Sequence, residues 1–429
     1  MNQLALLVSN FYKWMAKQQP TAPEFARQRD FVEAALSGDT HKVRTYCHHQ
    51  TFGPNDGVFH DAFWYACARL QVDVAKLLLE YGANPNTCFS SALPYSVLHQ
   101  ATSSTLTRGA GPESRALFDL LLRHKVNPNV GRDCEGKSPL MFVISKISHA
   151  TRDLAQHHLD LAEILLQHGA DINAKDIYHR TALFELLFQG GYWVETIEWM
   201  VDQYGADISV RDNMGWTLLH VIVASRPNEV QLIRSLVARE IDVNAATSNR
   251  GETALHFLVN STQLNSIETL ELLIEAGAKL DVPDLIQGQT ALHRAASARH
   301  LKSMLCLLEH GANVNIQDNC GNTALHLVTK NAYRCCGHIS FQASTDILRC
   351  LLGHSAKQGI RNAQGKTPLE LTCETSDCVD HLYHKMSKER RQQLGIPLSS
   401  LDLIFLLLEA LVQETREWAV VLQGRAEVA

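Results

Sequence analysis

A phrase of six residues, Gly-x-Thr-Ala-Leu-His, occurs three times along the chain, at Gly251–His256, Gly288–His293 and Gly321–His326. A second phrase, Leu-Leu-x-x-Gly-Ala-x-x-Asn, follows in whole or in part, and Leu307–Asn315 is its clearest copy. Two signals that recur in a fixed order indicate one structural unit duplicated along the chain. The position of the Thr recurs at intervals of 33 to 44 residues, at Asp61, Ser96, Ser138, Thr181, Thr217, Thr253, Thr290, Thr323 and Thr367.

Each part of the repeated phrase has a physical role in a pair of helices. A Thr or Ser before an apolar run is a helix N-cap, and Pro139 and Pro368 follow it at the first helical position, where a missing N–H costs nothing. A second helix ends at a glycine such as Gly311, which readily adopts the left-handed conformation of a C-cap. The segment from Asn315 to Gly321 then reads as a turn into the next unit. The pattern therefore predicts an array of helix pairs linked by turns.

This unit resembles the ankyrin repeat, whose pattern is Gly-x-Thr-Pro-Leu-His-x-Ala-Ala followed by Leu-Leu-x-x-Gly-Ala-Asp-x-Asn. The resemblance covers about ten repeats from residue 29 to 380. It implies an all-α solenoid of helix-turn-helix units with short β-hairpin-like turns. Residues 1–28, with apolar side chains at helical spacing from Leu4 to Met15, are expected to form a helical extension that caps the first repeat.

Insertions and the C-terminal tail depart from the bare repeat. Extra residues lie between the two helices of three repeats, near 102–114, 145–157 and 330–344. Residues 381–429 are expected to form a helical tail that either caps the last repeat or docks a partner. The segment from His381 to Leu398 is also faintly similar to the start of a SOCS box, a module that recruits a ubiquitin ligase. Met386 and Ser399 stand where that module has a cysteine and a second proline.

Composition limits the class of protein. The net charge is −6 and the isoelectric point is near 6.4, so there is no basic footprint for nucleic acid. The eleven cysteines form no disulfide framework, and Met1–Val8 carries no basic residue ahead of its apolar stretch, which makes a poor secretion signal. We therefore expect a cytoplasmic or nuclear protein. No apolar run is long enough to span a membrane. Oligomeric state is unknown, with a monomer favoured.

Few residues suggest chemistry. Histidines recur at one position of the repeat, which indicates a structural role, and we expect no catalytic residues, no metal and no cofactor; these histidines are His99, His220, His256, His293 and His326. Cys335-Cys336-Gly337-His338 lacks the second pair of ligands that zinc requires. The segment Leu236–Asn244 is similar to ankyrin sequences hydroxylated on asparagine, which makes Asn244 a candidate for that modification, with bracing of the turn as the alternative.

The resemblance implies a non-catalytic, intracellular scaffold that binds one or more partner proteins through the concave ankyrin groove. The alternative is a substrate-recognition adaptor of a ubiquitin ligase complex, with the tail as its docking module. Binding hot spots favour aromatic residues and Arg. The candidate contacts are therefore unusual residues of the turns and of the first helices, namely Tyr178, His179, Met214, Trp216, Asn249, Arg250, Phe257 and Arg294.

Overall fold

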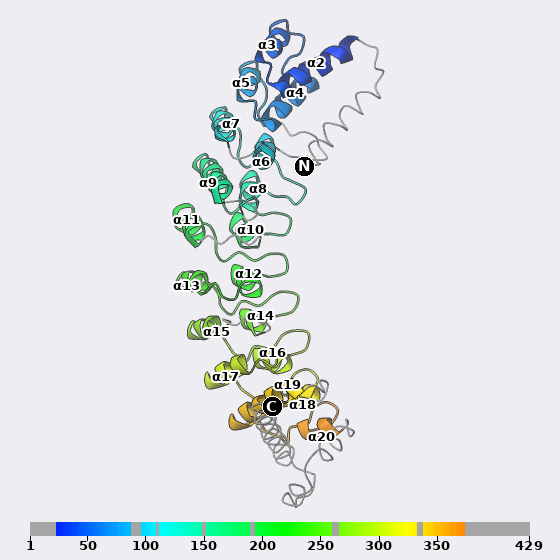
Figure 1. The fold of residues 1–429 in the computed structure, drawn as a ribbon, viewed down its shortest axis with the longest axis vertical. Helices are drawn as coiled ribbons and strands as arrows, with labels where there is room; N and C mark the ends of the chain where they lie inside the picture. The colour runs from blue at the N-terminus through cyan, green and yellow to red at the C-terminus, as the bar shows by residue number, and fades with distance from the viewer. Residues whose placement is uncertain are drawn as a thin grey trace, which may run out of the picture. The chain divides into compact units, whose positions relative to one another are not determined.

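The helices come as consecutive pairs, each with a first and a second helix, and a hairpin-shaped segment leads from each pair to the next (Figure 1). The computed structural model describes residues 23–86, 96–108, 111–147, 152–188, 194–259, 266–332 and 338–373. Helices α2 to α19 form nine pairs, and α20 is the first helix of a further one. No strand occurs in these ranges. The predicted all-α ankyrin solenoid is confirmed.

The chain divides into two compact units, Met1–Asn213 and Met214–Ala429, which we call unit 1 and unit 2. The helices of unit 1 are α2 (Pro23–Ser37), α3 (Thr40–His48), α4 (Gly57–Ala68), α5 (Val72–Glu80), α6 (Val97–Arg108), α7 (Pro112–Arg123), α8 (Pro139–Ser145), α9 (Arg152–Gln167), α10 (Ala182–Phe188) and α11 (Val194–Tyr204). Those of unit 2 are α12 (Leu218–Ser225), α13 (Val230–Ala238), α14 (Ala254–Leu258), α15 (Ser266–Glu275), α16 (Ala291–Ala298), α17 (Leu301–Glu309), α18 (Ala324–Ala332), α19 (His338–Gly353) and α20 (Pro368–Cys373).

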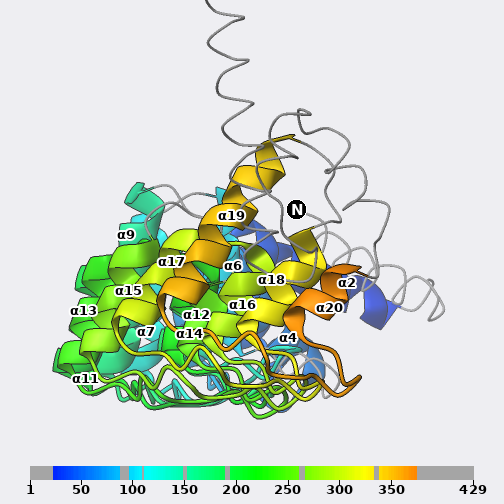
Figure 2. The same ribbon diagram turned by 90° about the horizontal axis from the view of Figure 1, so that it is seen from below.

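Within each unit the helices form two layers. First helices pack on first helices, as α4, α6, α8 and α10 do in unit 1, and second helices pack on second helices, as α5, α7 and α9 do. The same two layers are visible in unit 2, where α13, α15 and α17 lie beside α12, α14 and α16 (Figure 2). Leucines and alanines such as Leu292, Ala295, Ala296 and Leu307 are almost fully buried between the layers. Each repeat therefore completes its core only with its neighbours.

The repeated Thr and His join each repeat to the next. In α16 the backbone N–H of Thr290 donates to His293 Nδ1 at 3.2 Å, and Nε2 of the same ring lies 3.1 Å from the carbonyl oxygen of Asn322 in the following repeat. This bonding requires a neutral ring, because Nδ1 accepts a hydrogen bond. Burial lowers the pKa of His293, and it lowers that of His99 to about 4. The same pattern holds at the other predicted positions, so the structural role is confirmed for His99, His220, His256, His293 and His326.

The hairpins are braced in the same periodic manner. The backbone N–H of Asp176 donates to the carbonyl of Arg180 at 3.0 Å, as in a β-hairpin. At the base of the hairpin, Asn173 donates from Nδ2 to Gly205 O at 3.1 Å and accepts from the N–H of Asp207 at 2.8 Å. Asn129, Asn244 and Asn315 make equivalent bonds to the next repeat. Two recurrent side chains, the His and the Asn, therefore fix the position of each repeat on its neighbour.

Several predicted segments lie outside the described residues. These are residues 1–22 of the N-terminal extension, the whole tail 381–429 and the Cys335-Cys336-Gly337 sequence. Parts of the three predicted insertions, 109–110, 148–151 and 333–337, also fall there. The proposed roles of the extension, the insertions and the tail therefore stay predictions.

Candidate protein-binding surfaces

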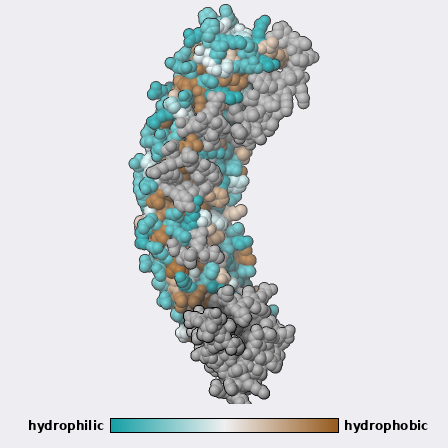
Figure 3. All heavy atoms as spheres, in the orientation of Figure 1, coloured by the Kyte–Doolittle hydropathy of each residue, from teal (hydrophilic) through white to brown (hydrophobic). Residues whose placement is uncertain are grey.

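Large exposed apolar side chains are not scattered over the described residues. Those that protrude are Ile177 (58% exposed), Tyr178 (41%), Phe188 (57%), Met214 (54%), Leu285 (69%) and Ile286 (58%). All of them belong to hairpins except Phe188, which ends the first helix α10. Single exposed apolar residues are ordinary, but their concentration on one kind of element marks an interaction surface. Figure 3 shows hydrophobic patches that interrupt the largely hydrophilic surface of the described residues.

In unit 1, Arg180 contacts two of these aromatic rings. The guanidinium carbon of Arg180 lies 4.6 Å from the centre of the Tyr178 ring and 5.3 Å from that of Phe188. We call Ile177, Tyr178, Arg180 and Phe188 the aromatic cluster. Cation–π contacts of this kind restrict both partners. The cluster is therefore a partly rigid surface whose rings remain open to contact.

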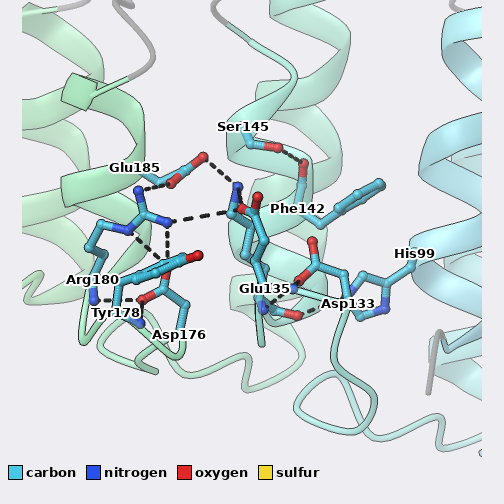
Figure 4. Close-up of polar contacts among 10 residues, drawn as sticks. His99, Asp133, Glu135, Phe142, Ser145, Asp176, Tyr178, Arg180 and Glu185 are labelled. Atoms are coloured by element: carbon cyan, nitrogen blue, oxygen red, sulfur yellow. Dashed lines mark hydrogen bonds and ion pairs between the residues drawn. The ribbon is translucent and has the colours of Figure 1, made fainter. Parts of the chain in front are cut away.

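A network of charged side chains includes Arg180 and lies beside Tyr178 (Figure 4). Glu185 on α10 is fully buried, and its Oε1 is 2.7 Å from Nζ of Lys137, whose side chain is 8% exposed. Lys137 also contacts Glu135 at 2.8 Å, and Arg180 is 2.9 Å from Asp176. We call these five residues the ion network. Since a buried charge is tolerated only when it is paired, the network fixes two successive hairpins to the first helix α10.

The pKa values within the ion network follow from its geometry. Burial acts to lower the pKa of Lys137, but the hydrogen bonds to Glu135 and Glu185 outweigh it and raise that pKa overall. The hydrogen bond from Lys137 lowers the pKa of Glu135. Both shifts favour the charged forms, so the pairs persist at neutral pH.

Nearby, Lys146 at the end of α8 has its ammonium 4.4 Å from the centre of the Phe142 ring. Burial is the main cause of the lowered pKa of Lys146, and the nearby charge of Lys137 adds to it.

In unit 2 two aromatic residues, Trp216 and Phe257, occupy the repeat positions that Lys137 and Glu185 have in unit 1. The ring centres of Trp216 and Phe257 are 4.9 Å apart, and Phe257 also meets the His220 ring edge-to-face at 5.6 Å. Both aromatic residues are partly buried. Offset and edge-to-face contacts stabilise such clusters beyond simple burial. Trp216 and Phe257 therefore join two repeats as well as lining the surface.

Arg294, Glu252 and Asp284 form a second ion network in unit 2. Nη2 of Arg294 is 2.6 Å from Glu252 Oε1 and 3.0 Å from Asp284 Oδ2, and all three side chains are largely buried. Asp284 Oδ1 also accepts from the backbone N–H groups of Ile286 and Gln287. Burial alone would raise the pKa of Asp284, but these hydrogen bonds and the charge of Arg294 lower it. Arg294 therefore offers little free surface to a partner.

These three contacts share one rule of position. In each contact, one residue stands directly before the repeated Thr or Ser of its own repeat. The other residue stands four positions after the repeated Thr of the next repeat. The pairs are Lys137 with Glu185, Trp216 with Phe257, and Glu252 with Arg294. Each pair is chemically complementary, and each differs from the others. The pairing therefore gives these neighbouring repeats a specific match on the face that the first helices form.

The predicted contact residues fall into two groups. Exposed residues on hairpins are Tyr178, His179, Met214, Asn249 and Arg250, while Trp216, Phe257 and Arg294 are partly buried in the pairs described above. Sequence reasoning missed Ile177, Phe188, Leu285 and Ile286. A signal was present, because Asp-Ile-Tyr and Asp-Leu-Ile place apolar residues at turns that are normally polar. The role of all these residues in binding stays a prediction.

Asn244 has both ends of its amide engaged. Nδ2 donates to Gly277 O at 3.0 Å, and Oδ1 accepts from the N–H of Lys279 at 2.7 Å. Its backbone N–H donates to Asp242 Oδ1 at 3.0 Å. This is the bracing role expected from its place in the repeat. Hydroxylation of Asn244 stays a prediction.

The described ranges contain no cluster of His, Cys, Asp and Glu that could hold a metal ion. A Ser114–His157 contact of 2.7 Å joins α7 and α9, but Ser114 is fully buried and also donates to Gly111 O at 2.8 Å. This contact is therefore a packing interaction between second helices. Within the same ranges, no helix combines the length and apolar character required to cross a membrane.

Comparison with known families gives consistent matches. The description "Ankyrin repeats (3 copies)" matches residues 187–284 and 258–339, and "Ankyrin repeat" matches residues 135–177. An ankyrin repeat protein of fowlpox virus is 33% identical over 155 residues, which is 35% of this chain and 42% of the viral protein. The B-cell lymphoma 3 protein homolog of Mus musculus is 31% identical over 186 residues, which is 43% of this chain and 38% of that protein.

Two further matches cover different extents. The E3 ubiquitin-protein ligase KEG of Arabidopsis thaliana is 24% identical over 366 residues, covering 78% of this chain but 21% of KEG. The crystal structure of the ankyrin repeat domain of Bcl-3 is 25% identical, with a TM-score of 0.43 over 55% of this chain and 94% of that domain. The chain spans less than half the length of these three curated relatives. The repeated phrases, the paired helices and the family matches agree: the chain contains ankyrin repeats, which match the family models over residues 135–177 and 187–339.

Proposed function

We propose that this protein is a non-catalytic scaffold that binds partner proteins through its hairpins and first helices. One observation carries the proposal: the large exposed apolar residues of the described ranges lie on hairpins or at the end of a first helix. Second helices show the opposite pattern, since α13 buries Leu232, Ile233 and Leu236 and leaves Gln231 and Arg234 exposed. Apolar side chains gain about 25 cal/mol per Å² when a partner covers them.

The two ion networks support the same proposal. They hold the hairpins through paired charges, and in unit 1 Arg180 also contacts the rings of Tyr178 and Phe188, which remain 41% and 57% exposed. A surface that is already ordered loses less side-chain entropy on binding. Tyr178 and Phe188 are therefore the residues of unit 1 that we expect to act as anchors. We further propose a cytoplasmic or nuclear setting, consistent with free cysteines at positions 47, 67, 134, 306, 320 and 350.

Affinity capture with the full chain tests this function. Tyr178→Ala with Phe188→Ala should weaken capture of partners that use unit 1 by at least about tenfold, because anchor residues contribute about 2 kcal/mol or more. The matched control is Lys76→Ala with Glu80→Ala, since both side chains are exposed on the second helix α5. Hydrogen exchange of α8 and α10 checks that the variant stays folded. Equal loss of partners in the anchor variant and the control would contradict the proposal.

A ubiquitin ligase adaptor is the second candidate. It rests on the similarity of residues 381–398 to a SOCS box and concerns the tail, which lies outside the described residues. Deletion of residues 395–429 should then abolish co-purification of elongin B and elongin C while hydrogen exchange of α18 and α20 stays unchanged. Loss of protection in α18 and α20 would instead identify the tail as a cap.

A further inference from the structure

We propose that the hairpin tips of unit 2 form a docking site for an acidic peptide segment that carries aliphatic side chains. This inference rests on the protein-binding function proposed above and specifies a partner chemistry for one surface. The surface, which we call the tip strip, consists of Met214, Arg250, Leu285 and Ile286 together with the neutral residues between them.

The tip strip is continuous from one hairpin to the next. The backbone N–H of Ser248 donates to Met214 O at 2.8 Å, that of Leu285 to Arg250 O at 2.8 Å, and that of Asn319 to Gln287 O at 2.8 Å. Each tip is therefore hydrogen-bonded directly to its neighbour. The side chain of Leu285 also lies against Gly251, where an added Cβ would stand 2.6 Å from Leu285 Cγ. The three exposed aliphatic side chains thus belong to one connected row.

The tip that carries Met214 also holds the exposed Arg211 and the half-buried Asp212, and the exposed charge of the three tips after it is positive. Residues 245–251, 282–289 and 316–322 contain two aspartates, Asp284 and Asp318, and both are buried. Asp284 accepts from backbone N–H groups and pairs with Arg294, and Asp318 Oδ1 accepts from the N–H groups of Cys320 and Asn322. No carboxylate is exposed on these three tips.

Arg250 supplies the exposed charge. Its side chain is 59% exposed and its Nη1 is 3.8 Å from Glu252 Oε1, while the same oxygen is 2.6 Å from Nη2 of Arg294. Arg294 is the nearer cation of Glu252 but also pairs with Asp284, so Arg250 contributes to the balance of these two carboxylates. Because its side chain is 59% exposed, its guanidinium can still reach a further carboxylate. The other exposed polar residues of these three tips carry no charge; they are Ser248, Asn249, Gln287, Gln317 and Asn319.

These features define the complementary partner. A carboxylate can make a charge-assisted, two-point hydrogen bond to the exposed guanidinium of Arg250. Aliphatic side chains beside that carboxylate can cover Met214, Leu285 and Ile286. A basic segment would place like charges together at Arg250, which is unfavourable. The strip therefore selects an acidic segment with aliphatic residues over a basic or a purely polar one.

A peptide selection on the full chain tests this inference. A random displayed library of about twelve-residue peptides is selected on the immobilised protein. We expect enriched sequences to combine Asp or Glu with Leu, Ile, Val or Met, and a synthetic copy of the top sequence then serves as the probe. Its affinity, measured by fluorescence polarisation, should fall about tenfold for Arg250→Ala and further for Arg250→Glu. Leu285→Ser with Ile286→Ser should cause a similar loss.

The controls separate the site from general effects. Arg234→Ala removes an exposed arginine from the second helix α13 and should leave the affinity unchanged. A probe with its acidic residues changed to Asn or Gln should bind about tenfold more weakly and should no longer distinguish Arg250→Ala from the unmodified protein. Raising the salt concentration should weaken only the acidic probe.

Two results would overturn the inference. One is enrichment of basic or uncharged peptides, or of none; the other is a probe affinity that Arg250→Glu and the Leu285 and Ile286 changes leave intact. Failure of the proposed function is a separate outcome, because it is measured by capture of whole partner proteins through the surfaces of both units.

Discussion

Replacing Lys137 with Met tests whether the ion network of unit 1 holds one repeat to the next, because Lys137 lies before α8 and its partner Glu185 lies on α10. Glu185 is fully buried, and Lys137 is its nearest cation at 2.7 Å. Breaking a buried pair by removing one partner costs about 3–5 kcal/mol, because the other charge remains without compensation. Arg180 stays 3.8 Å from Glu185 Oε2 and offsets part of that cost. We therefore expect Lys137→Met to lower the free energy of unfolding by about 3 kcal/mol.

A second variant separates the lost pair from lost packing. Lys137→Met combined with Glu185→Leu removes both charges, and apolar replacement of a buried pair is often close to neutral. The double variant should therefore recover most of the lost stability. Lys175→Met is the matched control, since Lys175 is exposed on the hairpin that follows and should change stability by less than about 0.5 kcal/mol.

Hydrogen exchange of the amides in α8 and α10 is the appropriate assay, together with urea unfolding. Repeat arrays lose structure locally, so exchange reports the affected repeats directly. A cost below about 1 kcal/mol for Lys137→Met, or a double variant as unstable as the single one, would refute the role assigned to the network.

Three further predictions concern the repeat itself. Burial lowers the pKa of His99 to about 4, so the stabilisation from its neutral ring is complete above the unfolded pKa of about 6.5 and is lost as pH falls toward about 4. This loss is about 3 kcal/mol and is measurable as a falling urea midpoint; burial also lowers the pKa of His256, His293 and His326, which adds loss in the same direction. Gly215→Ala should destabilise its hairpin by about 1–3 kcal/mol in thermal unfolding, because Gly215 has a φ of 78° and an added Cβ would lie 2.5 Å from Ser248 N. Asn244→Ala should cost about 1–3 kcal/mol, seen as faster exchange at Lys279, because it removes two side-chain bonds to the next repeat.

The recurrent residues made the fold predictable from sequence. Thr290 and His293 have the same partners as their counterparts in other repeats, so their spacing identified both the helix start and the link to the next repeat. The role of Arg294 was not predictable in the same way. Its contact with Glu252 joins the same two repeat positions as Lys137–Glu185 and Trp216–Phe257, but the residue types differ in each pair, so the repeat pattern does not identify the ion pair.

Exposure on the hairpins was also only partly predictable. Tyr178 and Met214 stood out as large residues at turns, whereas Leu285 and Ile286 resemble the start of a buried segment in sequence. The structure shows that Asp284, directly before them, is the buried residue. Its carboxylate pairs with Arg294 and accepts from two backbone N–H groups. The two side chains that follow, Leu285 and Ile286, are 69% and 58% exposed. Only the folded hairpin shows this exposure.

Hydrogen exchange of the full chain, with and without a partner protein obtained by affinity capture, tests the central claim most directly. The account predicts slower exchange at hairpin residues 176–180, 248–250 or 284–288 and at the adjoining first helices, with unchanged exchange in second helices such as α5 and α13. Slower exchange confined to the second helices, with the hairpins unaffected, would contradict it.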